Sequence, residues 1–283
     1  MFKTVVDGLV FPEAPRWRDG RLWWSDMHGD RVQSWAPGNE PRQEAEVPNR
    51  PSGLGWLADG DLLIVSMMDR KLLRRTADGA LTTHADLAAI APSRLNDMVV
   101  DARGRAYIGN FGFEIDDAGP LKVAPTVLAM VEPDGRARVV ADGLIFSNGA
   151  VITPDGKTLI VAETWGVRLT AFDIDANGDL SRQRLWAALP ADDLHDGICL
   201  DAEGCIWVAC PMTNSCLRVS EGGEVLQRID TGRPAFACVL GGAGGRTLYI
   251  CTAADHDRGR RRADPSGRIV AVEVAAPAAA DPT

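Results

Sequence analysis

The stretch Gly143-Leu-Ile-Phe-Ser-Asn-Gly-Ala-Val-Ile-Thr-Pro-Asp-Gly-Lys-Thr-Leu-Ile-Val-Ala-Glu-Thr164 decides the fold class of this chain. Two short runs rich in β-branched residues, 150–153 and 158–162, flank a Pro-Asp-Gly tripeptide. Proline and glycine suit a tight turn and are poor in a strand interior, so the stretch predicts a β-hairpin. Asn148 stands just ahead of the first run, where hydrophobic burial alone would not place an amide. It is therefore the first candidate site residue.

The turn of this hairpin recurs along the whole chain. The glycines that mark the turn are 40 to 52 residues apart: Gly20, Gly60, Gly104, Gly156, Gly204 and Gly244 or Gly245. A period of this length is typical of propeller blades. An apolar run follows each turn, as expected for a strand covered on both faces by neighbouring blades, and the last run of a unit is more polar. The sequence therefore predicts an all-β, six-bladed β-propeller with four-stranded blades.

The two ends of the chain predict how the ring closes. After 268–274 the sixth unit has no further strand, whereas the N-terminal run 3–6 is a strand without a blade of its own. Pairing these two segments would remove exposed sheet edges, so the N-terminal strand is expected to close the last blade. The chain is interpreted as one domain, 1–274. The alanine- and proline-rich segment 275–283 can bury little and is expected to be a flexible tail.

Composition restricts the function classes. The 283 residues carry a net charge of −9, and no run of 18 apolar residues or signal peptide is present. These features favour a cytoplasmic protein, a monomer or weak homo-oligomer, that binds neither nucleic acid nor membranes. The basic run 258–262 is interpreted as a solvated loop. Six cysteines without a C-x-x-C pair predict buried reduced thiols.

Polar residues recur in one phase of the repeat, about eight positions before the turn glycine. This phase holds Glu13, Ser52, Asn96, Asn148, Asp196 and, in the sixth unit, Phe236. In a propeller this phase is the start of the innermost strand, so these side chains should converge at one mouth of the central channel. Carboxylate and amide oxygens at one point suit one divalent metal ion, such as calcium, zinc, manganese, magnesium or iron.

Some of these residues also have a purely structural interpretation. Asn and Asp are common at strand starts because they hydrogen-bond to local backbone, and it is the four amides and carboxylates in one phase that favour a site. His195 precedes Asp196 and, because side chains alternate along a strand, should point away from the channel. Phe111 and Phe113, in the long insertion 110–125, are candidates for a pocket rim.

Four motifs resemble the signature blocks of the senescence-marker-protein, gluconolactonase and luciferin-regenerating-enzyme family. They are Phe11-Pro-Glu-Ala-Pro-Arg-Trp17, Arg94-Leu-Asn-Asp97, Phe146-Ser-Asn-Gly149 and the segment Asp196 to Gly204. The similarity runs from about 11 to 274 in the family's order. The resemblance implies a six-bladed propeller whose single divalent metal is held by Glu13, Asn148 and Asp196. It also implies that Asn96 lies beside the metal and that Arg94 and Glu114 contact substrate. Departures from the pattern are Ala14, Met98 and His195.

Two classes of function agree with these observations. The first is a metal-dependent hydrolase that opens a small-molecule sugar lactone to the aldonic acid, with Asp196 as the candidate general base, or a related metal-dependent esterase or organophosphate hydrolase. The second is a non-catalytic propeller that binds calcium or another protein. The charged pair Arg94 and Glu114 favours the hydrolase, because a binding platform has no reason to place such a pair at the metal-bearing mouth.

Overall fold

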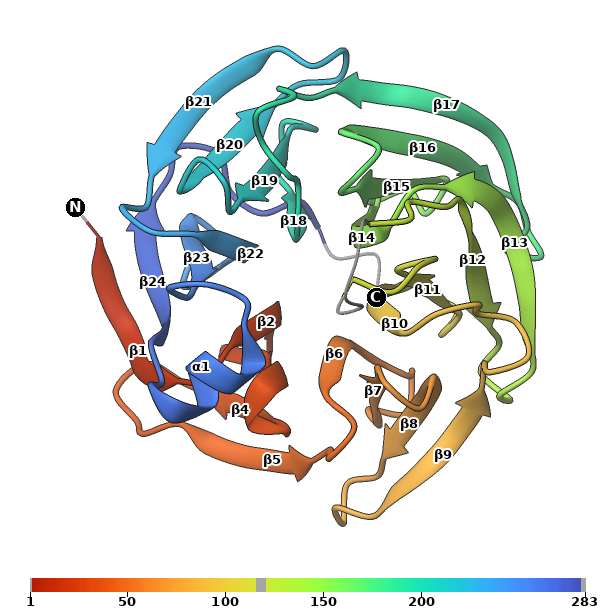
Figure 1. Ribbon diagram of the computed structural model, residues 1–283, viewed down its shortest axis with the longest axis horizontal. Coiled ribbons are helices and arrows are strands. Elements are labelled where there is room, and N and C mark those ends of the chain that lie inside the picture. Colours follow the sequence, from red (N-terminus) through yellow and green to blue (C-terminus); the bar gives the residue numbers. More distant parts are fainter. Residues whose placement is uncertain (1, 116–120, 281–283) are drawn as a thin grey trace.

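Six four-stranded antiparallel sheets form a ring in the computed structural model (Figure 1), which confirms the predicted six-bladed β-propeller. The structure describes residues 2–115 and 121–280. In each blade the strands follow one another from the channel outward in chain order, except that the outermost strand of the last blade comes from the N-terminus.

Each of the first five blades is a continuous segment of four strands, with the first strand of the segment innermost. Blade 1 holds β2 (Pro12–Arg18), β3 (Arg21–Asp26), β4 (Arg31–Trp35) and β5 (Arg42–Glu46). Blade 2 holds β6 (Pro51–Trp56), β7 (Leu62–Ser66), β8 (Lys71–Arg75) and β9 (Leu81–Asp86). Blade 3 holds β10 (Leu95–Val100), β11 (Ala106–Asn110), β12 (Thr126–Val131) and β13 (Ala137–Leu144). Blade 4 holds β14 (Ser147–Ile152), β15 (Thr158–Glu163), β16 (Arg168–Ile174) and β17 (Leu180–Ala188). Blade 5 holds β18 (Ile198–Leu200), β19 (Ile206–Cys210), β20 (Ser215–Val219) and β21 (Val225–Asp230).

Blade 6 is closed by the N-terminal strand, as predicted. It contains β22 (Ala235–Gly241), β23 (Thr247–Thr252), β24 (Gly267–Glu273) and β1 (Lys3–Leu9). β1 pairs antiparallel with β24, and Val6 and Leu9 of β1 are buried against the core of this blade. The edge that β24 would otherwise expose is therefore covered.

The repeated turns have the backbone conformation that their glycines predict. Gly20, Gly60, Gly104, Gly156 and Gly204 all have φ between 68° and 90°, the left-handed region that glycine adopts without steric cost. Each of these turns joins an innermost strand to the second strand of the same blade. The six innermost strands therefore run in the same direction along the channel. We call the end at which they begin the upper end and the end at which they finish the lower end.

The hydrophobic core lies between neighbouring blades. The largest clusters of buried side chains join strands of blades 2 and 3 and of blades 4 and 5. Aromatic pairs cross the same kind of boundary: Trp17 of blade 1 stacks on Tyr249 of blade 6 with ring centroids 5.3 Å apart, and Trp23 packs edge-on against Trp56 of blade 2. All six cysteines are free and buried, as expected.

Two segments differ from the sequence-based expectation. The basic run is not a solvated loop: it forms helix α1 (Arg258–Ala263), capped by Asp257, whose carboxylate accepts from the backbone N–H of Arg260. Arg258 and Arg262 pair with Asp30 beside the short 3₁₀ helix η1 (Met27–Gly29). The expected flexible tail is, at 277–279, hydrogen-bonded to the lower turns: Ala202 N donates to Pro277 O, Ala278 N to Gly245 O and Ala279 N to Leu200 O.

Nothing among the described helices has the length and apolar character needed to cross a membrane. The cytoplasmic location and the monomeric or weakly oligomeric state stay predictions.

Candidate functional site at the upper end of the channel

The upper end gathers the residues of the predicted repeat phase. In five blades the pairing of the innermost strand with the second strand shifts register within its first few residues: after Glu13, Pro51, Leu95, Ser147 and Ala235. Such bulges bend a strand and change the direction of a side chain. In blade 5 regular pairing begins only at Ile198, two residues after Asp196. At these irregular strand starts the backbone leaves the regular pairing, so the side chains need not alternate between the two faces of the sheet.

Glu13 and Asp196 are brought together although they come from blades 1 and 5. Burial raises the pKa of the Glu13 carboxyl well above its usual range, and the negative charges of Asp196 and Asp97 raise it further. Burial likewise raises the pKa of Asp196, with a further contribution from Asp97, while a hydrogen bond from Asn148 lowers it. Carboxylates that destabilise one another in this way have too little positive charge around them.

Asn148 is fixed by a chain of hydrogen bonds. Its Nδ2 donates to Thr164 Oγ1 at 2.9 Å, and Thr164 Oγ1 donates to the backbone oxygen of His195 at 2.8 Å. All three residues are buried. These two hydrogen bonds join blade 4 to the residue just before Asp196, so Asn148 and Asp196 are held by the same buried network. Sequence analysis missed Thr164, although it ends the stretch from which the fold was predicted.

Asn96 and Ser52 instead link neighbouring blades. Ser52 Oγ donates to Asn96 O at 2.6 Å, and Asn96 Nδ2 donates to Ser147 O at 3.1 Å. Ser25 Oγ extends the series by donating to Ser52 O at 2.6 Å. These buried bonds hold the tops of blades 1 to 4 at fixed spacing. Hydrogen bonding to the backbone therefore explains why a polar residue stands at Ser52, without a role in a site.

The second sequence-predicted pair lies at the same end in blade 3. Arg94, only 6% exposed, forms an ion pair with Glu114, whose side chain is 45% exposed. Ser93 Oγ donates to Glu114 Oε1 at 2.9 Å. The guanidinium carbon of Arg94 also lies 5.5 Å from the centre of the Phe111 ring, which stacks on Phe146. Residues 116–120 of the insertion 110–125 lie outside the described residues.

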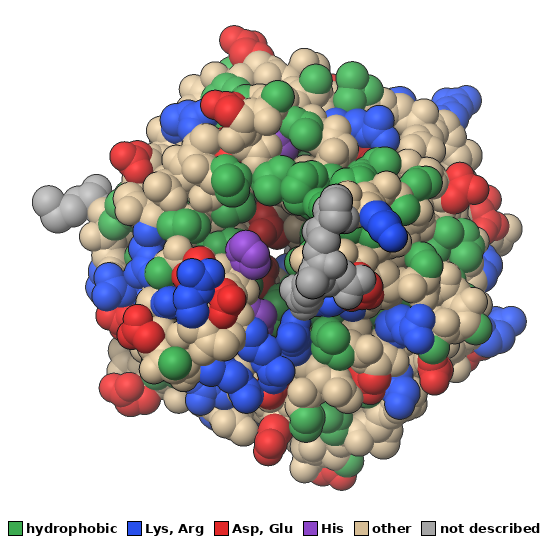
Figure 2. Space-filling model, viewed as in Figure 1, with side chains coloured by type: hydrophobic (Ala, Val, Ile, Leu, Met, Phe, Trp, Pro, Cys, Tyr) green, Lys and Arg blue, Asp and Glu red, His purple; other side chains and the backbone are tan. Residues whose placement is uncertain are grey.

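An apolar collar surrounds this end. It consists of one connected cluster of buried side chains: Phe11, Met27, Met67, Phe111, Phe113, Phe146, Phe236 and Ala253. Phe11 and Phe146 each stand two residues before a predicted metal-binding residue. Phe111 and Phe113, predicted for a pocket rim, belong to this collar. Acidic side chains are visible in the central opening, and histidine and basic side chains lie beside it (Figure 2).

Two histidines are held neutral near this end. His195 is fully buried, and burial lowers its pKa to about 4. Within the described residues neither ring nitrogen has a hydrogen-bond partner. His28 stacks on Phe11 with ring centroids 4.7 Å apart, its Nε2 meets the backbone oxygen of His256, and burial lowers its pKa to about 4. His28 lies in η1, outside the repeated polar positions, so nothing in the sequence pattern indicated that it lies near the site.

The two other departures from the family motifs have local structural explanations. Ala14 has a φ of 46°, the left-handed region in which glycine is favoured. Met98 is fully buried and fits because Gly53 and Gly55 of the adjacent strand β6 leave room for it: a Cβ at Gly53 would lie 2.8 Å from Met98 Cγ. Met98 therefore packs between blades 2 and 3.

Arg16 and Asp97 form a further, partly buried ion pair that sequence analysis missed. Arg16 Nη2 donates to Asp97 Oδ1 at 2.7 Å and to Met98 O at 2.6 Å. Asp97 is the fourth residue of the motif that begins at Arg94, which could have indicated it. Asp97 therefore already has a cationic partner, whereas Glu13 and Asp196 are the two carboxylates of the predicted repeat phase.

The predicted donor set fits a divalent cation. Two half-buried carboxylates that repel one another would be stabilised by positive charge, and an amide oxygen is an accepted partner for hard cations. The described residues contain no group of three or more His, Cys, Asp or Glu side chains placed to hold a metal. The set of Glu13, Asn148 and Asp196 combines two such side chains with an amide.

Comparison with known proteins places the chain in a family. The SMP-30/Gluconolactonase/LRE-like region matches residues 11–254, most of the chain. This chain belongs to the SMP-30/gluconolactonase/LRE-like family. The resemblance inferred from the four motifs is thereby confirmed.

Several relatives match this chain over nearly their whole length. Regucalcin of Xenopus laevis is 28% identical over 275 residues, which cover 94% of this chain and 91% of that protein. The 6-deoxy-6-sulfogluconolactonase of Pseudomonas putida is 27% identical over a match that covers 99% of this chain and 96% of that protein. The solved structure of a gluconolactonase from Xanthomonas campestris superimposes with a TM-score of 0.77 at 24% identity, over 97% of this chain and 89% of that one. This last similarity shows the fold.

Proposed function

We propose that this protein is a divalent-metal-dependent hydrolase that opens a sugar lactone to the aldonic acid. The observation that carries the proposal is the pair of half-buried carboxylates with raised pKa values, Glu13 and Asp196, beside Asn148 at the channel end that also holds Arg94 and Glu114. Family membership and relatives named as lactonases support the same reaction class.

The side chains divide into binding and reacting groups. Glu13, Asn148 and Asp196 would hold the cation, which supplies Lewis-acid stabilisation of the negative charge that develops on the lactone carbonyl oxygen. Asp196 would take a proton from the attacking water as the oxygen of that water bonds to the carbonyl carbon. The ring C–O bond then breaks, and the leaving oxygen receives the proton back from Asp196. Positive charge beside Asp196 would keep its carboxyl ionised at neutral pH, as a base requires.

Arg94 and Glu114 would hold the sugar. A guanidinium and a carboxylate together offer donors and acceptors to neighbouring hydroxyl groups. Burial of Arg94 against Phe111 fixes its direction, whereas Glu114 is half exposed and accessible from the mouth. If their role is uniform substrate binding, Arg94→Ala should raise KM more than it lowers kcat.

The test is proton release from aldonolactones after treatment of the protein with a chelator and re-addition of single cations: calcium, magnesium, manganese, zinc or ferrous iron. We expect turnover to disappear with the chelator and to return with at least one cation. Failure to open any aldonolactone with any of these cations would contradict the proposal and favour the non-catalytic calcium-binding or protein-binding propeller.

A further inference from the structure

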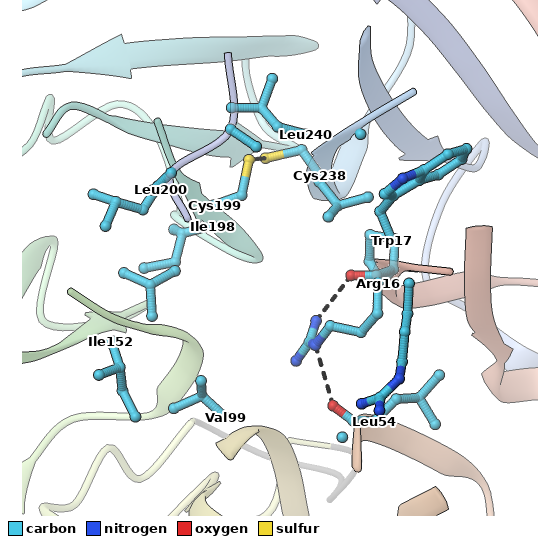
Figure 3. Close-up of a pocket in the computed structure, with 18 of the residues that line it drawn as sticks. Arg16, Trp17, Leu54, Val99, Ile152, Ile198, Cys199, Leu200, Cys238 and Leu240 are labelled. Atoms are coloured by element: carbon cyan, nitrogen blue, oxygen red, sulfur yellow. Dashed lines mark hydrogen bonds between the residues drawn. The ribbon is translucent and has the colours of Figure 1, made fainter. Parts of the chain in front are cut away.

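The lower end of the channel contains a separate cavity of about 290 Å³ (Figure 3). Its wall is formed by the later residues of the six innermost strands, among them Val99, Ile152, Ile198 and Leu240. Residues 278–280, held by the backbone bonds to Leu200 and Gly245, add to the wall. The metal-binding candidates at the upper end do not line this cavity.

The wall combines an apolar surface with two guanidinium groups. Among the described residues that line the cavity, the charged ones are Arg16 and Arg18, and none is acidic. Arg18 lies with its guanidinium carbon 5.0 Å from the centre of the Trp56 ring and pairs with the exposed Asp19. A pocket of apolar side chains with a few fixed polar groups is the usual form of a small-molecule site.

Arg16 places a fixed guanidinium in the middle of this space (Figure 3). Its Nε donates to Leu54 O at 3.1 Å and its Nη1 to Pro15 O at 2.9 Å. With the two bonds from Nη2 to Asp97 and Met98, four of the five N–H groups have acceptors. Within the part of the chain that the structure describes, Nη1 makes one bond, so its second N–H can donate to a ligand.

We propose that the lower cavity binds a small monocarboxylate with an unbranched apolar chain, a short or medium-chain fatty acid anion, with its carboxylate on Arg16 and its chain against Val99, Ile152 and Ile198. Carboxylate is the acceptor that a guanidinium favours. The volume lies at the lower limit of ligand pockets, about 300 Å³, which favours a small ligand. The inference is independent of the proposed lactonase reaction.

The most direct test varies the chain length and the charge of the ligand. Its affinity is measured by calorimetry or by the fluorescence of Trp17 and Trp56 in the wall. The probes are butyrate, hexanoate and octanoate, with octan-1-ol and octylamine as neutral and cationic counterparts. Burial of one methylene contributes about 0.8 kcal/mol, so each should tighten binding about fourfold until the cavity is full. We expect octanoate to bind at least about tenfold more tightly than octan-1-ol, the scale of a hydrogen bond to a charged group.

Two variants locate the binding. Arg16→Met keeps the apolar stem and should reduce binding of octanoate to that of octan-1-ol. Because Arg16 also supports Asp97, Val99→Phe provides a second variant: it fills the cavity from blade 3 and should abolish octanoate binding while the melting temperature is retained. The matched control is Val139→Phe, on the exposed side of β13. The proposal would be overturned by equal affinity for octanoate and octan-1-ol, or by carboxylate affinities that do not change with chain length. Full octanoate binding by folded Val99→Phe would also overturn it.

Discussion

The two ends of the channel are formed by the same six strands, yet their side chains have opposite chemistry. At the upper end, Glu13 and Asp196 lie within an apolar collar, and the local charge is negative. At the lower end, Arg16 and Arg18 lie among aliphatic side chains, and no acidic side chain is among the described residues that line the cavity. Bulges at the strand starts direct side chains into the upper end, whereas the strand ends pair regularly. One repeated strand can thus supply two separate sites when only its first residues leave the regular pairing.

The largest effect should come from removing what both ends share, the closed ring. Deletion of residues 1–7 removes most of β1, including the buried Val6, and exposes the edge of β24. We expect a loss of several kcal/mol in the free energy of unfolding, or aggregation, because an unpaired strand edge and an apolar cavity result. Thermal melting and light scattering measure this. Lys3→Ala, an exposed change in the same strand, is the control. A deleted protein that melts like the parent would contradict the closure.

Asp196→Asn tests the upper end alone. An amide oxygen can still coordinate a cation but is a poor base, so we expect kcat for lactone opening to fall at least about a hundredfold. The matched control is Asp201→Asn, in the same blade at the lower turn, where Asp201 binds Arg218 and backbone N–H groups. That change should lower stability but leave the turnover of folded protein near that of the parent. Near-normal turnover of cation-saturated Asp196→Asn would refute the general-base role.

Metal stabilisation should also depend on the upper end only. A cation that binds the folded protein raises the melting temperature by mass action. Glu13→Gln and Asn148→Ala should each reduce that rise, because each removes a predicted oxygen donor. Arg18→Gln at the lower end should leave it unchanged. Melting curves over a series of cation concentrations measure the effect, and a rise that survives both upper-end changes would place the cation elsewhere.

The smallest expected effect is a dependence of stability on pH in chelator-treated protein. Folding raises the pKa of Glu13 and of Asp196, so the folded state binds more protons than the unfolded chain between the unfolded and folded pKa values. Their contribution to stability is therefore present at low pH and is lost as pH rises through the folded pKa. A shift of one unit corresponds to about 1.4 kcal/mol.

Differences between variants isolate this contribution from other titrating groups. The fall in melting temperature of the chelated protein between pH 5 and pH 8 should be smaller in Glu13→Gln than in the parent. The control Glu46→Gln, on the exposed strand β5, should behave like the parent. A Glu13→Gln variant with the parent's full pH dependence would show that this carboxyl is not responsible.

The sequence by itself determined the features that repeat. Turn glycines at a blade-length spacing, strand runs between them and an unpaired strand at each terminus predicted the ring and its closure, because each depends on local backbone preference and period. The same period placed Glu13, Asn148 and Asp196 in one phase, and the structure brings Glu13 and Asp196 to one end of the channel with Asn148 beside Asp196.

Only the tertiary structure decided which side chains meet across blades. Arg16 reaches Asp97, 81 residues away, and Arg258 reaches Asp30, 228 residues away. Neither contact follows from the period, because it depends on how neighbouring blades are rotated and on how long side chains cross the space between them. For the same reason the basic run became a capped helix paired with Asp30, and the lower cavity with its central Arg16 had no signal in the sequence.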